Sequence, residues 1–311
     1  MNIIGHKKQI DFLKKCLERD SVLQAYIFSG PEGVGKFLIA KNFARNIISG
    51  DSSQGGSESD RDFSCDVDEK IKMSPNFIFV SPQKKEKKGV TKESDISIDD
   101  VRDAQKKLST FPSQGKFNVL IVNDAHKMNK SAQNALLKTL EEPNSSSIII
   151  LVTHRESNVL QTIKSRCNIV RFGTVTLGEI ERELRESGVE DSNEISFFSL
   201  GRPGFAIRLK NDSELLSFRR EEYKRFRGIF RADIDEKLEW AQESSKNVNE
   251  AVERLELWIW FLRVQAYQNI SDEKKVRLIY DAISKIEEST VKMKETNASS
   301  RLILENLLMS F

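Results

Sequence analysis

The stretch Ile27-Phe28-Ser29-Gly30-Pro31-Glu32-Gly33-Val34-Gly35-Lys36-Phe37 joins a short apolar run to a glycine-rich turn and then to a helical pattern. A Gly-x-x-x-x-Gly-Lys turn between a strand and a helix is typical of a phosphate-binding loop, in which backbone N–H groups and the helix N-terminus surround the phosphates. We therefore predict that Gly30, Gly35 and Lys36 form the scaffold of a nucleotide site. The pattern normally ends with a Ser or Thr that binds Mg²⁺, and Phe37 has no oxygen to offer a hard cation.

Apolar runs alternate with helical patterns through the first half of the chain. The runs predict strands at residues 25–29, 77–80, 119–122, 148–152 and 169–172. This alternation predicts an α/β domain at residues 1–175, with a mainly parallel sheet covered on both faces. The Ser/Gly/Asp tract at residues 50–62 and the lysine-rich segment 83–89 predict loops, and contact with phosphate is the alternative for the second segment.

Beyond about residue 177 the pattern becomes helical throughout. We predict short helices at residues 176–210 and long helices at residues 211–311 as two further domains. A basic stretch between Arg219 and Arg227 is interpreted as a solvated face, with an interface as the alternative.

The composition bounds the class of protein. A length of 311 residues with 38% hydrophobic residues allows two or three domains with a sizeable core. The net charge of +2 is too small to indicate nucleic-acid binding by the whole molecule. The absence of an 18-residue apolar run argues against a membrane span, and three scattered cysteines make no disulfide framework. We expect a cytoplasmic protein.

A second nucleotide-site position lies after the strand at residues 119–122, where the sequence reads Asn123-Asp124. In P-loop ATPases a carboxylate at this position binds Mg²⁺. Asn123 is a neutral and weaker ligand, so both protein contacts to Mg²⁺ are altered, here and at Phe37. Asp124 is the carboxylate that the segment retains.

Several motifs carry a resemblance: the loop Ser29–Lys36, the segments Asn134–Pro143 and Ser165-Arg166-Cys167, the turn Gly201–Ala206 and the segment Asn297–Leu302. Together they resemble the clamp-loader branch of the AAA+ ATPases, and within it the delta-prime subunits of the bacterial DNA polymerase III clamp loader. The resemblance implies a RecA-like AAA+ domain, a small helical lid domain and an all-α C-terminal collar domain. It also implies a pentameric hetero-oligomer that contains motor subunits and a delta-type subunit.

In that family the motor subunits bind ATP and Mg²⁺ at subunit interfaces, and the complex loads the sliding clamp on primer–template DNA during replication. The resemblance makes Arg166 an arginine finger, which acts in trans on the ATP of a neighbouring subunit. The alternative is that Arg166 only pairs with a local carboxylate. The chain itself is expected to contribute this arginine and structural support to the complex. It is expected to carry out little or no ATP hydrolysis of its own.

Metal sites are not expected. Many members of the family carry a four-cysteine zinc module, and the corresponding stretch offers only Cys65, so we predict no zinc. The histidines His6, His126 and His154 show no metal-ligand spacing. The interpretation is a chain with no cofactor of its own, whose partners hold the ATP and Mg²⁺.

Two further positions bear on the nucleotide site. Motor subunits of the family place a nucleotide-sensing arginine where this chain has Gly204, and Thr153 matches a polar sensor position. ATP binding at Lys36 is doubtful but stays open. The competing hypothesis is a self-sufficient ATPase, either a motor or a remodeller, in which Asp124 and waters hold a relaxed Mg²⁺ site.

Overall fold

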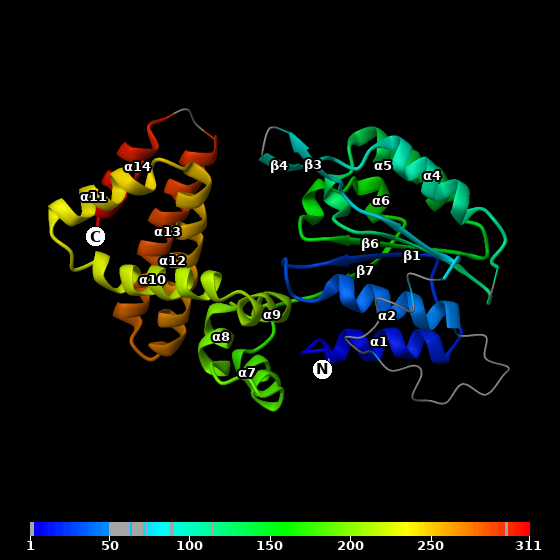
Figure 1. Cartoon of the computed structure of the whole chain (residues 1–311), viewed down its shortest axis with the longest axis horizontal. Helices are drawn as coiled ribbons and strands as arrows, with labels where there is room; N and C mark the ends of the chain where they lie inside the picture. Colours follow the sequence, from blue (N-terminus) through cyan, green and yellow to red (C-terminus); the bar gives the residue numbers. More distant parts are fainter. Residues whose placement is uncertain are drawn as a thin grey trace. The chain divides into compact units, whose positions relative to one another are not determined.

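The computed structural model describes residues 3–49, 63, 71, 74–87, 90–113, 115–295 and 298–311. The chain divides into two units, Met1–Asn211 and Asp212–Phe311 (Figure 1). The separate lid domain expected at residues 176–210 stays a prediction. The tract at residues 50–62 and Cys65, the residue that decided the zinc prediction, lie outside the described residues.

The first unit is built on a five-stranded parallel sheet of order β2-β5-β6-β1-β7 (Figure 1). Its strands are β1 (Ala25–Ser29), β2 (Phe77–Val80), β5 (Asn118–Val122), β6 (Ser147–Thr153) and β7 (Asn168–Arg171). β5 and β6 are paired in register from Asn118 with Ser147 to Val122 with Leu151. The α/β class is confirmed, and the strand bounds differ from the predicted ones by no more than a residue.

Helices cover both faces of this sheet. Tyr26 and Phe28 face a core that contains α1 (Lys7–Glu18) and α2 (Lys36–Ser49). Ile27 faces the other core, which is covered by three helices. These are α4 (Ile98–Leu108), α5 (Lys130–Glu141) and α6 (Gln161–Lys164). Since successive side chains of a strand point to opposite faces, strands between two helical layers become continuous apolar runs.

Shorter elements complete the first unit. The 3₁₀ turns η2 (Ala125–Lys127) and η3 (Glu156–Asn158) follow β5 and β6 respectively. Three helices follow β7: α7 (Leu177–Glu186), α8 (Ser192–Phe198) and α9 (Pro203–Asn211).

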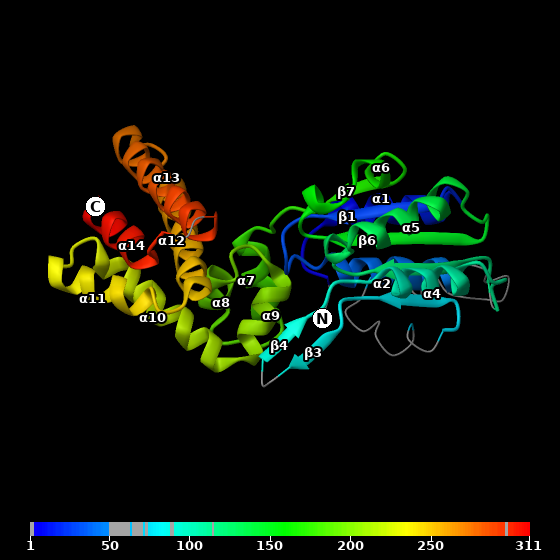
Figure 2. The same ribbon diagram turned by 90° about the horizontal axis from the view of Figure 1, so that it is seen from above.

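One predicted loop is wrong. The lysine-rich segment contributes β3 (Lys84–Lys87), which pairs antiparallel with β4 (Val90–Glu93). The two strands form a ribbon that extends away from the main sheet (Figure 2). Neither strand has alternating apolar residues, so the period of two that signals a strand is missing from the sequence. Backbone pairing holds this ribbon together.

The second unit is all-helical. Its helices are α10 (Ser213–Ile229), α11 (Ile234–Ser244), α12 (Val248–Gln268), α13 (Glu273–Glu295) and α14 (Ser300–Met309). Aromatic rings form its core: the Phe226 ring lies 5.2 Å from that of Phe261 and 5.9 Å from that of Trp258. Among the described residues, no helix has both the length and the apolar character needed to cross a lipid bilayer.

The solvated face predicted for the basic stretch is wrong for Arg219. This side chain is buried on α10, and its guanidinium lies 3.2 Å from Glu253 of α12. A charged group inside a helical unit needs such a partner, because an unpaired buried charge is strongly disfavoured. The pattern of charges along the sequence does not show which cation faces inward.

Candidate functional site

The glycine-rich loop between β1 and α2 has the backbone that the sequence predicts. Gly30, Gly33 and Gly35 all have positive φ angles, of 149°, 77° and 100°. A Cβ at Gly30 would lie 2.1 Å from the carbonyl oxygen of Phe172, so no larger residue fits there without a backbone shift. The scaffold of a phosphate-binding loop is therefore retained.

Lys36 is bound to its own loop. Its Nζ donates hydrogen bonds to the carbonyl oxygens of Gly30, at 2.7 Å, and Pro31, at 2.6 Å. The side chain is buried, and this burial lowers the pKa of Lys36 to about 8. An incoming phosphate would have to take over one or both of these hydrogen bonds.

Phe37 packs at the position where a hydroxyl would bind Mg²⁺. Its ring lies 5.3 Å from that of Phe79 on β2, and the Nζ of Lys41 lies 4.7 Å from the centre of the Phe37 ring. Both contacts are favourable, through aromatic packing and through a cation over a π face. The side chain has an apolar packing role and contributes no metal ligand.

The first turn of α9 contacts the glycine-rich loop directly. The Gly204 N–H donates to the Gly33 carbonyl oxygen at 2.7 Å. A Cβ at Gly204 would lie 2.9 Å from the same oxygen. In this arrangement a side chain at position 204, such as the sensing arginine of a motor subunit, would displace the backbone of the loop.

Asp124 follows β5 in a left-handed conformation, with φ 52° and ψ 46°. Its Oδ1 lies 3.5 Å from Nδ1 of His154, and its Oδ2 accepts a hydrogen bond from Nδ2 of Asn123 at 3.3 Å. The contact with His154 holds the pKa of Asp124 below its usual range. The carboxylate that a relaxed Mg²⁺ site would use thus already has two protein neighbours.

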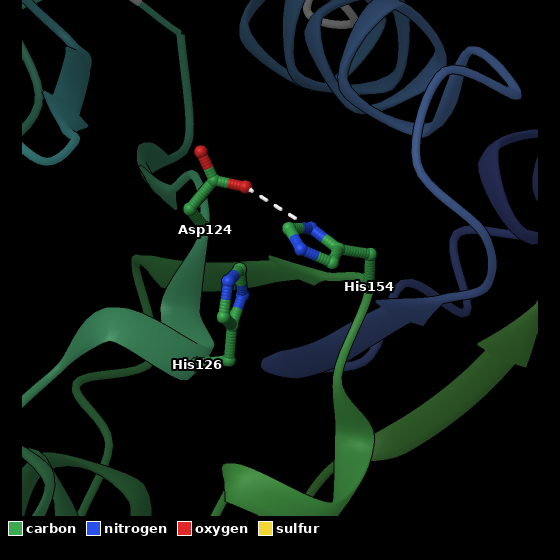
Figure 3. A group of neighbouring side chains, drawn as sticks. All are labelled: Asp124, His126 and His154. Carbon is green, nitrogen blue, oxygen red and sulfur yellow. Dashed lines mark ion pairs between the residues drawn. The ribbon is translucent and has the colours of Figure 1, made fainter. Parts of the chain in front are cut away.

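Two histidines meet beside Asp124, as Figure 3 shows. The ring centres of His126 and His154 are 4.0 Å apart. Burial, and then the neighbouring His154, lowers the pKa of His126 to about 4. The linear spacing hides this proximity. The sequence shows no metal-ligand spacing for the histidines, but the fold brings ligand atoms of His126, His154 and Asp124 within 4.8 Å of one another. The available signal was topological, since one histidine closely follows β5 and the other directly follows β6.

Thr153 lies next to His126. It is fully buried at the end of β6, and its Oγ1 accepts a hydrogen bond from the Arg155 N–H at 3.1 Å. The same oxygen is 3.4 Å from Nδ1 of His126. The hydroxyl at the sensor position therefore contacts groups of its own chain.

Arg166 lies between α6 and β7 and is partly exposed. One guanidinium nitrogen is 2.9 Å from Oε1 of Glu141 at the end of α5, and the other donates to the Thr162 carbonyl oxygen at 3.0 Å. This local pairing is the alternative that the sequence left open for Arg166. Next to it, burial raises the pKa of the Cys167 thiol to about 12, so that cysteine is not a nucleophile at neutral pH.

The sequence matches the family described as DNA polymerase III, delta subunit, over residues 5–176. This match covers more than half of the chain.

Curated relatives are similar over a little more than half of the chain. The chain is 29% identical to DNA polymerase III subunit delta' of Pseudomonas aeruginosa, over 60% of this chain and 55% of the relative. It is 30% identical to DNA polymerase III subunit tau of Bacillus subtilis, over 56% of this chain and 29% of the relative. The matched region thus spans about half the length of the first relative and less than a third of the second.

The solved structures to which the chain is similar include two from Thermotoga maritima. One is the RuvB Holliday junction branch migration motor, with a TM-score of 0.44 and 20% identity over 67% of this chain and 61% of that one. Another is a DNA polymerase III gamma subunit-related protein, with a TM-score of 0.40 and 18% identity over 97% of this chain and 98% of that one.

Proposed function

Because the chain belongs to the DNA polymerase III delta-subunit family, we propose that it is a non-motor, delta-prime-like subunit of a clamp loader. In this role it joins motor subunits and a delta-type subunit in a pentameric assembly that uses ATP to load a sliding clamp on primer–template DNA. Residues 211–311 serve as the collar. Contact of this subunit with DNA is minor and is made to the phosphate backbone.

The packing of Phe37 is the observation that carries the non-motor part of this proposal. A benzyl ring held between Phe79 and Lys41 replaces the hydroxyl that would bind Mg²⁺. Asn123 replaces the second ligand and is engaged with Asp124. Phosphoryl transfer depends on metal ions that bridge the β- and γ-phosphates, so this donor set does not fit a Mg²⁺–ATP centre.

Arg166 is the residue we propose to act on the ATP of a neighbouring motor subunit. Its guanidinium is partly exposed, and its carboxylate partner Glu141 is more exposed still. A planar guanidinium can bind two phosphate oxygens as readily as it binds a carboxylate. The local ion pair therefore serves as a resting contact that a phosphate can replace.

The test is the ATPase of the complex assembled from this chain and its cognate motor and delta-type subunits. Arg166→Ala should lower turnover at the one ATP site it faces by about three orders of magnitude, the modest end of the range for arginine fingers. The complex then loses that site's share of its ATPase, with assembly unchanged by size-exclusion chromatography. Arg171→Ala is the matched control, since Arg171 is also an exposed arginine paired with a glutamate, Glu156. Unchanged turnover in an intact Arg166→Ala complex would disprove the arginine finger.

The retained loop supports a second candidate, a self-sufficient ATPase. The three glycines keep the backbone of a phosphate-binding loop, and Lys36 lies against that loop. Calorimetric titration of the purified chain with ATP, with and without Mg²⁺, decides between the two. We expect no binding that Mg²⁺ strengthens. Binding that tightens with Mg²⁺ and disappears in Lys36→Ala would favour the ATPase.

A further inference from the structure

Three potential metal ligands converge at one edge of the parallel sheet. Asp124 and His126 follow β5, and His154 follows β6. These two strands are neighbours, with Val122 paired to Leu151, so the residues that follow them meet at the same edge. Figure 3 shows the three side chains around a common space.

We propose that Asp124, His126 and His154 form a binding site for a divalent transition-metal ion of the zinc type. One ligand atom from each residue lies within 4.8 Å of the other two. Metal–ligand bonds to imidazole nitrogen and carboxylate oxygen are about 2.0–2.2 Å long, so the donors around one ion are a little over 3 Å apart. Donor atoms within 4.8 Å of one another are therefore near the spacing that one ion requires.

The type of donor selects the class of ion. Two imidazoles and one carboxylate suit zinc and the neighbouring first-row ions, whereas Mg²⁺ prefers oxygen alone. Three protein ligands leave positions for water, as in open metal sites. This proposal departs from the expectation of a chain without metal, and it does not depend on the clamp-loader role.

Neighbouring groups already restrain two of the ligands. The Asp124 carbonyl oxygen accepts a hydrogen bond from the Lys127 N–H at 2.8 Å, which closes the η2 turn that carries His126. The Thr153 hydroxyl lies 3.4 Å from Nδ1 of His126. Outer contacts of this kind fix the orientation of ligands and contribute to metal affinity.

A polar cavity of about 390 Å³ gives access to the cluster. Besides the three ligands it is lined by Glu32, Asp95, Lys127, Arg155 and Asn158. Two carboxylates and two cations leave the rest of its wall close to neutral, so entry of a hydrated dication meets no excess of positive charge. The volume also holds the waters that would complete the coordination shell.

The experiment is a titration of the full-length chain with Co²⁺, whose visible absorption reports its coordination, followed by displacement with Zn²⁺. We expect one Co²⁺ per chain, and binding at least tenfold weaker in both His126→Gln and His154→Gln. Asn158→Ala, which changes the same cavity without removing a ligand, should bind as the wild type does. His6→Gln controls for adventitious binding by a histidine outside the cluster.

A measurement on the wild-type chain covers the case in which a variant does not fold. The imidazole ¹⁵N resonances of His126 and His154 should both shift on addition of Zn²⁺, while those of His6 stay in place. The proposal is overturned if no Co²⁺ or Zn²⁺ binds at millimolar concentration. It is equally overturned if binding is undiminished in a folded His126→Gln/His154→Gln chain, or if Zn²⁺ leaves both resonances unchanged.

Discussion

Two corners of the first unit hold a cation in different ways. At the P-loop corner, residues 30–37, Lys36 is buried and donates to two carbonyl oxygens of its own loop. At the arginine corner, residues 164–167, the Arg166 side chain is 37% exposed and faces Glu141, which is 52% exposed. Buried polar contacts are costly to break, whereas exposed ion pairs are worth little. An incoming phosphate would therefore compete with an exposed ion pair at Arg166, but with two hydrogen bonds of a buried side chain at Lys36.

The largest loss of stability is expected from Gly30→Ala, which disturbs the backbone of the P-loop corner. The new Cβ would meet the Phe172 carbonyl oxygen at 2.1 Å, at a φ of 149°. Backbone strain and overpacking together should lower the free energy of unfolding by about 3–5 kcal/mol. Urea denaturation measures this loss.

Gly35→Ala is the matched control for that change. Gly35 also has a positive φ, 100°, but a Cβ there would meet nothing within 4 Å. Only the strain applies, so the expected loss is about 1–2 kcal/mol. Equal losses in the two variants would show that the contact with Phe172 does not shape the loop.

Phe37→Thr tests whether the P-loop corner can recover a metal ligand. The variant restores a hydroxyl but loses the contacts with Phe79 and Lys41, so stability should fall by about 1–2 kcal/mol. Magnesium-dependent ATP binding should not appear by calorimetry, because Asn123 still lacks a carboxylate. Phe111→Thr, at a ring that is 92% exposed, should change stability little. Tight binding of Mg²⁺–ATP by Phe37→Thr alone would contradict the assigned role of Asn123.

The pH dependence of stability tests the histidine cluster. The pKa of His126 is lowered from 6.5 to about 4 by burial, then by His154, with Lys127 and Arg155 adding to the effect and Asp124 opposing it. Between these values the unfolded chain binds more protons than the folded one, so stability should fall as the pH drops from 6.5 to 4. The contribution is at most about 3 kcal/mol.

Urea denaturation in the presence of a chelator measures that slope, so that bound metal does not contribute. His126→Gln should remove part of it, because glutamine does not titrate. His6→Gln is the comparison, since burial also lowers the pKa of His6 at its contact with the Val34 carbonyl oxygen. An unchanged slope in His126→Gln would show that folding does not lower the pKa of His126.

The sequence predicted the sheet well because its strands are buried on both faces. The run Ile148–Val152 has no polar residue, so its strand is plain without any partner in view. The ribbon of β3 and β4 was missed because most of its residues are charged and its two strands are joined by backbone pairing. The burial of Arg219 was missed because a helix in a bundle can turn one of several cations inward.

The candidate site was predictable only in part. The glycine positions follow from local sequence, since glycine adopts positive φ angles without the steric cost that a side chain would add. The meeting of His126 with His154 depends on which strands are neighbours, and a list of spacings does not contain that order. The sequence left two partners open for Arg166: a local carboxylate, or the ATP of a neighbouring subunit. The sequence does not choose between them, because an isolated chain offers the guanidinium a carboxylate and an assembly would offer it a phosphate.

The smallest loss of stability is expected from Glu141→Gln, which tests the ion pair of the arginine corner. Removing the charge leaves Arg166 with the Thr162 carbonyl oxygen and the Ser165 hydroxyl, at 3.0 and 3.3 Å. Because the pair is exposed, the free energy of unfolding should fall by less than about 1 kcal/mol in urea denaturation. Glu142→Gln, at the next exposed carboxylate, is the control. A loss above about 2 kcal/mol would mean that Glu141 locks the guanidinium in place, and the exchange of Glu141 for a phosphate would then be too costly for an arginine finger.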